Sequence, residues 1–170
     1  FDAIPGNILK CFENMTHYPI EIVNNNERLR FIWYSDDNND YLICENAKLK
    51  SFKTYGDLEK YCLDNKLILD KTDHIKEYDF DIIKTWINSQ IALSDNDILD
   101  FWNLFIDISV SLNCIFSGDK NDELRNAIYE KLCDSVIWCK ENEKHGLNDS
   151  DKKIIAGYFK DGLEIFENNK

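Results

Sequence analysis

Carboxylates are the most abundant groups in this 170-residue chain that could do chemistry, with 32 Asp and Glu against 20 Lys and Arg. Two carboxylates that face each other across a cleft can work as general acid and general base. In a chain this rich in acid, chance alone supplies many such pairs, so the sequence marks none of them as catalytic. A small acidic enzyme that uses a carboxylate pair therefore stands as an alternative.

Metal binding is the next chemistry that an acidic chain suggests. Asp36, Asn38 and Asp40 match the first alternating ligands of an EF-hand calcium loop. That loop needs glycine at its sixth position and a bidentate glutamate at its twelfth, but Tyr41 and Ala47 stand there. We therefore expect a solvated hairpin turn, because short Asp and Asn side chains bond to their own backbone in turns.

Other catalytic signatures are missing from the sequence. Its histidines, His17, His74 and His145, lie far apart, and none has a His or Cys at the spacing of zinc ligands. The glycines form no phosphate-binding loop and no Gly-x-Ser-x-Gly element. The six cysteines form no CxxC pair and fall in apolar segments, which favours reduced core thiols. We expect no catalytic residue, no cofactor and no metal.

The charge of the chain indicates a basic partner. The formal net charge is -12, and no Lys or Arg occurs between Thr85 and Asp119. Such a chain repels nucleic acid and anionic lipid and attracts a cationic protein. The same stretch carries the apolar residues of a core helix, so the acid belongs to a folded element and not to a disordered tail.

One predicted helix carries a narrow polar stripe on an otherwise apolar surface. Asp100, Asn103, Asp107 and Ser111 form it at spacings of three, four and four residues. Two interpretations stay open: a plain solvent-facing strip, or part of a surface that binds a basic protein. The candidate partner-binding residues are Asp36, Asp37 and Asp40 in the hairpin turn, Asp70, Asp73, Glu77 and Asp79 in a later connector, and, as second choice, Asp100 and Asp107.

The elements that position these residues follow from periodicity. Residues 18–54 alternate with a period of two, which predicts an antiparallel meander of three or four strands. Thr54 and Asp57 resemble a capping box for a short helix that ends near Asn65. A further strand is expected at 67–69.

Helical spacing dominates the rest of the chain. A polar connector is expected over 70–81, followed by helices. Apolar residues at helical spacing place them near 83–91, 97–116, 124–139 and 149–166, and a short helix is also expected at 5–14.

Strands first and helices second, without regular alternation, predict an α+β fold: an N-terminal antiparallel β-meander with a short helix, then a C-terminal helical half. With 170 residues, 44% of them apolar, one domain over 1–170 is expected, strand-rich at 18–69 and helical at 79–168. No leader-like segment and no apolar run of about 20 residues is present. We therefore expect a cytoplasmic protein without membrane contact.

Aromatic and acidic positions across residues 29–113 resemble a known family. They are Phe31-Ile32-Trp33-Tyr34-Ser35, Tyr41-Leu42-Ile43, Leu49-Lys50-Ser51-Phe52, Leu58-Glu59-Lys60-Tyr61, Tyr78-Asp79-Phe80-Asp81 with Trp86, and Leu99-Asp100-Phe101-Trp102-Asn103-Leu104-Phe105 with Asp107. In these segments the chain is similar to immunity proteins of bacterial contact-dependent growth-inhibition and related polymorphic toxin systems.

This resemblance implies a small, cytosolic, non-enzymatic protein. Such a protein binds the toxic C-terminal domain of its cognate effector one to one and blocks it. The toxin domain is often a nuclease with a basic cleft, which an acidic inhibitor can occupy. The resemblance carries over no binding residue, because each pair has its own interface. A cytosolic adaptor with a different partner remains a further alternative.

Overall fold

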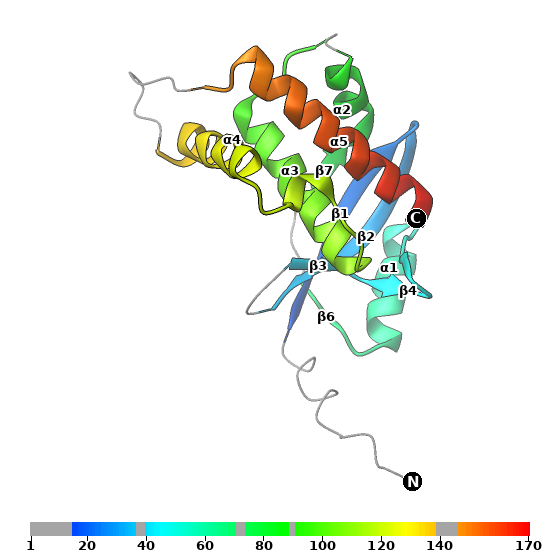
Figure 1. Ribbon diagram of the computed structural model, residues 1–170. Coiled ribbons are helices and arrows are strands. Elements are labelled where there is room, and N and C mark those ends of the chain that lie inside the picture. Colours follow the sequence, from blue (N-terminus) through cyan, green and yellow to red (C-terminus); the bar gives the residue numbers. More distant parts are fainter. Residues whose placement is uncertain (1–14, 37–39, 71–73, 89–90, 139–145) are drawn as a thin grey trace.

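The computed structural model describes residues 15–36, 40–70, 74–88, 91–138 and 146–170. Its strand elements precede most of its helices, as expected for an α+β fold (Figure 1). The elements are β1 (Thr16–Asn24), β2 (Glu27–Ser35), β3 (Asp40–Leu42), β4 (Cys44–Glu45), β5 (Lys48–Leu49), α1 (Tyr55–Asp64), β6 (Ile68–Leu69), β7 (Lys76–Asp79), α2 (Phe80–Ile87), α3 (Asp95–Ser111), the 3-10 turn η1 (Ser117–Asp119), α4 (Glu123–Cys133), the π turn η2 (Asp134–Trp138) and α5 (Asp149–Asn169).

The main sheet has the strand order β3-β2-β1-β6, and β7 also pairs with β1. The long pair β1 and β2 is antiparallel, with Ile20 opposite Phe31. Asn25 and Asn26 connect these strands with φ values of 54° and 58°, the left-handed geometry of a tight hairpin turn. The Asp81 carboxylate of α2 accepts from both of their backbone N–H groups at 2.8 Å, which ties the turn to that helix.

Both faces of the sheet are covered, so neighbouring residues of β2 are buried on opposite sides. Phe31 and Ile32 are both fully buried. Ile32 packs with Phe52 and with Leu58 and Cys62 of α1. The α1 helix begins as predicted, because the Thr54 hydroxyl oxygen accepts from the Asp57 N–H at 3.1 Å.

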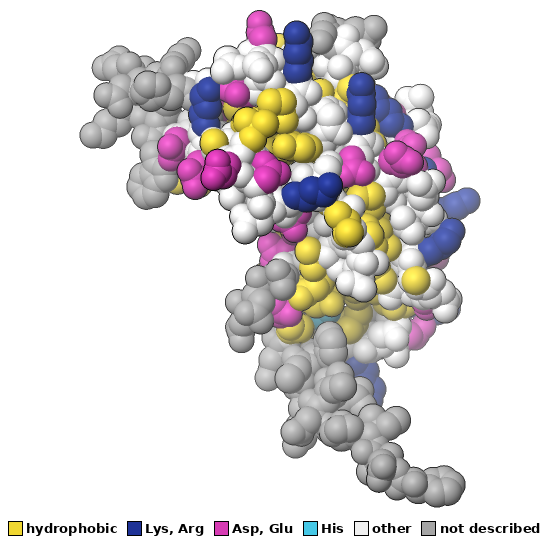
Figure 2. Space-filling model, viewed as in Figure 1, with side chains coloured by type: hydrophobic (Ala, Val, Ile, Leu, Met, Phe, Trp, Pro, Cys, Tyr) yellow, Lys and Arg dark blue, Asp and Glu magenta, His cyan; other side chains and the backbone are white. Residues whose placement is uncertain are grey.

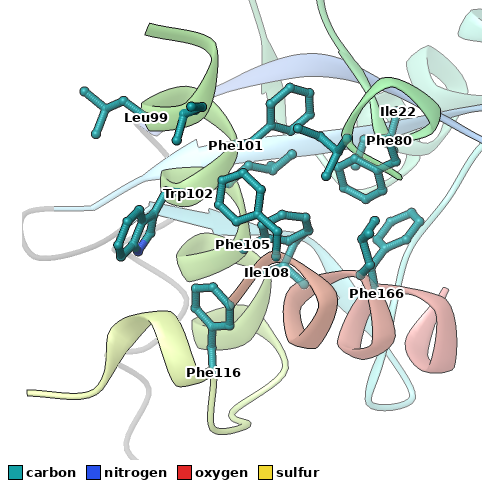
Figure 3. Packing of buried hydrophobic residues seen from close by; sticks show 14 of the residues in the cluster. Ile22, Phe80, Leu99, Phe101, Trp102, Phe105, Ile108, Phe116 and Phe166 are labelled. Carbon is teal, nitrogen blue, oxygen red and sulfur yellow. The ribbon is translucent and has the colours of Figure 1, made fainter. Parts of the chain in front are cut away.

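The larger core lies on the other face, beneath α2, α3 and α5 (Figure 3). Phe80 of α2 and Phe166 of α5 meet edge to face with their centroids 4.8 Å apart. Phe105 of α3 lies against α5 at Gly162, where a Cβ atom would come within 2.5 Å of the Phe105 ring. Glycine is therefore what allows α3 and α5 to approach each other.

The structure corrects the prediction for residues 70–81. The connector contains β7, which runs parallel to β1 with Ile22 opposite Tyr78, so the sheet is mixed and not a purely antiparallel meander. The pairing was not visible in the sequence because Lys76-Glu77-Tyr78-Asp79 has little apolar character and its partner strand is more than 50 residues away.

The central helix also differs in length from the prediction of 97–116. It begins at Asp95, where Ser94 caps it, and it ends at Ser111. Asn113 then adopts a φ of 50°, and the N–H groups of Asn113 and Cys114 donate to the carbonyls of Val110 and Ser109 at 3.1 and 3.0 Å, which closes the helix in a Schellman motif. The helix expected at 5–14 lies outside the described residues.

The cysteines are less uniformly buried than expected. Cys62 is buried, Cys44 and Cys133 are half-buried, and Cys114 is exposed, and all four are free thiols. None of the helices in the described segments combines the length and the apolar character needed to cross a bilayer.

Candidate functional site

The C-terminal half of α3 lies against the end of the β2–β3 hairpin. The Ser111 hydroxyl accepts from the Leu42 N–H of β3 at 2.7 Å and donates to the Asp107 carbonyl of its own helix at 2.5 Å. The Cys44 thiol donates to the Ser111 carbonyl at 3.3 Å. These contacts fix α3 to the edge strand of the sheet and set the position of the Asp107 side chain.

Asp107 is the most perturbed carboxylate at this junction. It is half-buried, and its Oδ2 accepts from the Trp33 indole N–H at 3.2 Å. Burial raises the pKa of Asp107 to about 7, and the nearby negative charge of Asp40 acts in the same direction, while the Trp33 hydrogen bond opposes them. No lysine or arginine in the described segments forms an ion pair with Asp107. Near neutral pH this group is therefore poised between its two protonation states.

Asp40 of β3 lies near Asp107, and the rings of Tyr18 and Trp33 lie close by. The Asp40 carboxylate accepts from the Ser35 hydroxyl across the hairpin. Tyr18, on the strand next to Trp33, lies with its ring centroid 5.6 Å from the Trp33 ring and is 36% exposed. Carboxylates and accessible aromatic rings thus lie side by side at this end of the sheet.

Asp100 lies two turns before Asp107 on the same helix and extends the acidic line. Its carboxylate forms an ion pair with Lys76 of β7. Tyr78 lies near both carboxylates. Burial is the main cause that raises its pKa to about 12, and the charges of Asp100 and Asp107 act in the same direction. We call Tyr18, Trp33, Asp40, Asp100 and Asp107 the hairpin–α3 surface. Figure 2 shows acidic side chains at the step between the helical part and the hydrophobic side chains near β3.

The polar stripe of α3 is thus not a plain solvent-facing strip. Asp100 pairs with Lys76, Asp107 with Trp33, and Ser111 with Leu42. Asn103 accepts from the Tyr129 hydroxyl of α4 at 2.7 Å. Every member of the stripe contacts another element, so the stripe fixes α3 to the sheet and to α4 as well as presenting charge.

Of the other predicted binding residues, Glu77, Asp79 and Asp70 have partners elsewhere in the molecule. Glu77 lies on the opposite face of the sheet, where it accepts from Arg28 at 2.7 Å. Asp79 caps α2 by accepting from the N–H groups of Asp81 and Ile82. The Asp70 N–H donates to the His17 carbonyl at 2.7 Å. Asp36 lies near Tyr34. Burial raises the pKa of Tyr34, and the negative charge of Asp36 acts in the same direction. Asp37 and Asp73 are outside the described residues.

A second charged cluster on the opposite face of the sheet is built differently. Glu21 of β1 is only 6% exposed and bonds to Arg28 and, at 2.8 Å, to Arg30. Arg30 also donates to the Lys53 carbonyl at 2.6 Å. This cluster is internally neutralised, so it offers little free charge to a partner.

Neither Trp33 nor Tyr18 is among the candidate binding residues predicted from the sequence. The hydrogen bond between Trp33 and Asp107 joins residues 74 positions apart, so no local sequence pattern predicts it. The usable signal was the polar stripe itself, since an acid on an otherwise apolar helix needs a hydrogen-bond donor from a neighbouring element. Among the residues that the structure describes, no three His, Cys, Asp or Glu side chains converge as metal ligands.

Comparison with known proteins gives a structural neighbour but no family. No protein-family model matches the chain, and no curated protein matches it at a significant level. Among solved structures, the C-terminal domain of SatS, crystallised in complex with bromine, superimposes with a TM-score of 0.51. The match covers 98% of this chain and 96% of that domain at 11% sequence identity. At this identity the similarity concerns the fold alone.

Proposed function

We propose that this chain is an immunity protein that binds the basic C-terminal toxin domain of a contact-dependent growth-inhibition effector through the hairpin–α3 surface. The observation that carries the proposal is the convergence of Asp40 and Asp107, from elements far apart in the sequence, next to Tyr18 and Trp33. The family resemblance across residues 29–113 supports the same class of protein.

Electrostatics favours a cationic partner at this surface. Asp40 and Asp107 form no ion pair within the described segments, and the chain as a whole carries a charge of -12. A negative protein with an uncompensated carboxylate patch steers a basic partner toward that patch and speeds association. A bound Lys or Arg would also supply the cation that Asp107 lacks.

The aromatic residues supply the second part of an interface. Tyr and Trp contribute much of the binding energy at protein interfaces, and an Arg side chain can stack on their rings. Tyr18 is accessible, and Trp33 is held in place by Asp107. The surface can therefore hold an arginine by its charge and by its planar face.

The proposed mechanism is occlusion of the toxin. Many toxin domains are nucleases, and a nuclease cleft must be basic to hold phosphate. Carboxylates placed on a rigid body can occupy that cleft as phosphate surrogates and exclude the substrate. The rigidity here comes from the contacts of α3 with β3 and α4.

The test uses the C-terminal domain of a large secreted protein encoded directly upstream of this chain. Co-expression should rescue cells that produce the domain, and calorimetry should detect a one-to-one complex at micromolar concentration or tighter. The double variant Asp40→Asn/Asp107→Asn should lower the association rate about tenfold and weaken its salt dependence. The matched control is Glu59→Gln/Asp64→Asn, which removes two exposed acids of α1.

Two results would count against this proposal. A complex that forms with unchanged rates in the double variant would move the interface elsewhere on the molecule. Absence of both rescue and binding would remove the immunity function itself and leave an adaptor that binds another partner.

A single observation favours the enzyme alternative. Two carboxylates lie close together, and the pKa of Asp107 is raised to about 7, as in general acids. Against catalysis, the structure engages Asp107 with Trp33 and Asp40 with Ser35. Turnover of a substrate without any partner, lost in Asp107→Asn, would decide for the enzyme.

A further inference from the structure

A cleft of about 430 Å³ opens between the end of α2 and the beginning of α5. Its apolar lining comes from Trp86 and Ile87 of α2, from residues 91–93, which precede α3, and from Ala156 of α5. Its volume falls in the range of small-molecule sites in proteins, about 300–1,000 Å³. The cleft is therefore large enough for a compact ligand and too small for a folded partner.

The apolar lining of this cleft is accessible to solvent. Ile91 is 41% exposed, although branched aliphatic residues are usually buried. Leu93 is half-buried next to it. An apolar ligand would remove this surface from water and gain free energy in proportion to the area covered.

The rim of the cleft is cationic in an otherwise acidic protein. Lys152 and Lys153 both line it, and neither forms an ion pair with any residue that the structure describes. Asp149 also lies on the rim, one turn before Lys153, and forms no ion pair with either lysine in the described part of the chain. In contrast, the single lysine of each of α2, α4 and β7 is paired: Lys84 with Glu167, Lys131 with Asp151 and Lys76 with Asp100.

We propose that this cleft binds a small apolar carboxylate, with an aromatic or branched aliphatic body against Ile91 and Leu93 and its carboxylate at Lys152 and Lys153. An ammonium group makes a strong charge-assisted hydrogen bond to a carboxylate, and two adjacent lysines favour an anion over a neutral ligand. The exposed side chain of Ile91 and the half-exposed side chain of Leu93 give a hydrophobic body apolar contacts that a fully polar anion such as phosphate cannot use.

This inference does not depend on the proposed function. The cleft lies where α3 begins, whereas Asp107, the central carboxylate of the hairpin–α3 surface, lies 12 residues after Asp95, about 18 Å further along a helix that rises 1.5 Å per residue. The site can therefore be occupied while a protein partner is bound, and each proposal can fail without the other.

The test is a titration of the full chain with 4-phenylbutyrate, followed by amide NMR shifts. We expect shifts at Ile87, Leu93 and Ala156 and a dissociation constant of about 0.1–1 mM, as suits a ligand of this size. The uncharged analogue 4-phenylbutan-1-ol should bind about fivefold more weakly. The double variant Lys152→Gln/Lys153→Gln should weaken carboxylate binding by about the same factor, because both changes remove the same charge interaction.

The matched control is Lys160→Gln, an exposed lysine further along α5 that does not line the cleft. It should bind 4-phenylbutyrate as the parent chain does. A second variant, Ala156→Met, should fill the cleft and abolish the shifts while the rest of the spectrum is kept. No shifts at these amides up to about 10 mM would overturn the site. Equal binding of the alcohol, or an unchanged constant in the double lysine variant, would overturn its preference for anions.

Discussion

Glu21 and Asp107 are carboxylates near opposite faces of one sheet, and the protein holds them in opposite ways. Glu21 is buried between Arg28 and Arg30, so its charge is neutralised where it lies. Within the part of the chain that the structure describes, the Asp107 side chain accepts from the Trp33 N–H and forms no ion pair, and burial, with the charge of Asp40 nearby, raises its pKa to about 7. The same functional group is thus satisfied on one face and left without a cation on the other.

The difference separates two uses of acid in this chain. A buried carboxylate with two guanidinium partners contributes to the fold, and little of its charge reaches the surface. A carboxylate without a cation lowers the stability of the free protein but can gain a cation from a partner. This is the expected trade between stability and binding at a functional surface. The comparison therefore favours the hairpin–α3 surface over the Glu21 cluster as the interaction site.

The largest effect is expected for Glu21→Ala. The substitution leaves Arg30, which is only 21% exposed, without its carboxylate partner, and we expect the free energy of unfolding to fall by about 3 kcal/mol. Urea denaturation measures it. The control is Glu27→Ala, an exposed residue at the start of β2, which should change stability by less than about 0.5 kcal/mol. Equal effects of the two variants would show that the Glu21 cluster is not structural.

A smaller effect, opposite in sign, is expected for Asp107→Asn. The folded pKa of about 7 lies above the ordinary value of 3.8, so the folded protein binds a proton that the unfolded chain releases between these values. Stability of the parent chain therefore falls as the pH rises from about 4 to 7. Asparagine keeps an acceptor for Trp33 and does not titrate, so the variant should be about 1–2 kcal/mol more stable at pH 8.

This gain should shrink as the pH falls, because Asp107 of the parent chain is protonated at pH 5. Urea denaturation of both proteins at pH 5 and pH 8 checks it, with Asp134→Asn, an exposed acid after α4, as the control. A variant that is less stable than the parent at pH 8 would mean that the Asp107 charge is stabilised by a group not yet identified. The carboxylates on both faces of the sheet would then be neutralised within the free protein.

Local signals predicted much of the fold. Thr54 and Asp57 gave the start of α1, and the alternation through Leu29, Phe31 and Trp33 gave β2. These features depend on residues close in sequence. The strand β7 and its parallel pairing with β1 depend on contacts across more than 50 residues, and its four residues carry no alternation of their own. Non-local pairing of a polar strand is what the sequence could not reveal.

The candidate site was predictable in part, for the same reason. Asp40, Asp100 and Asp107 were proposed from their acidity and spacing, and the structure brings Asp40 and Asp107 together. Glu77 and Asp79 were proposed on the same grounds, but β7 and α2 use them for an ion pair with Arg28 and for a helix cap. Acidity alone cannot separate these cases, because the partner of each carboxylate comes from a distant part of the chain.

The smallest effect on stability is expected for Lys76→Gln, which alters the charge beside Asp100 and leaves the Glu21 cluster unchanged. Lys76 forms the ion pair with Asp100 at the edge of the hairpin–α3 surface, and its side chain is 54% exposed. Solvent screens such a pair, so its loss should change the free energy of unfolding by less than about 0.5 kcal/mol. The same change removes the cation nearest to the proposed surface and should raise the association rate with a basic partner about twofold at low salt. Stopped-flow mixing at two salt concentrations measures this rate, with Lys66→Gln, an exposed residue after α1, as the control. If Lys76→Gln and Lys66→Gln speed association equally, the partner senses only the net charge of the chain, and the contrast between the two faces of the sheet has no part in recognition.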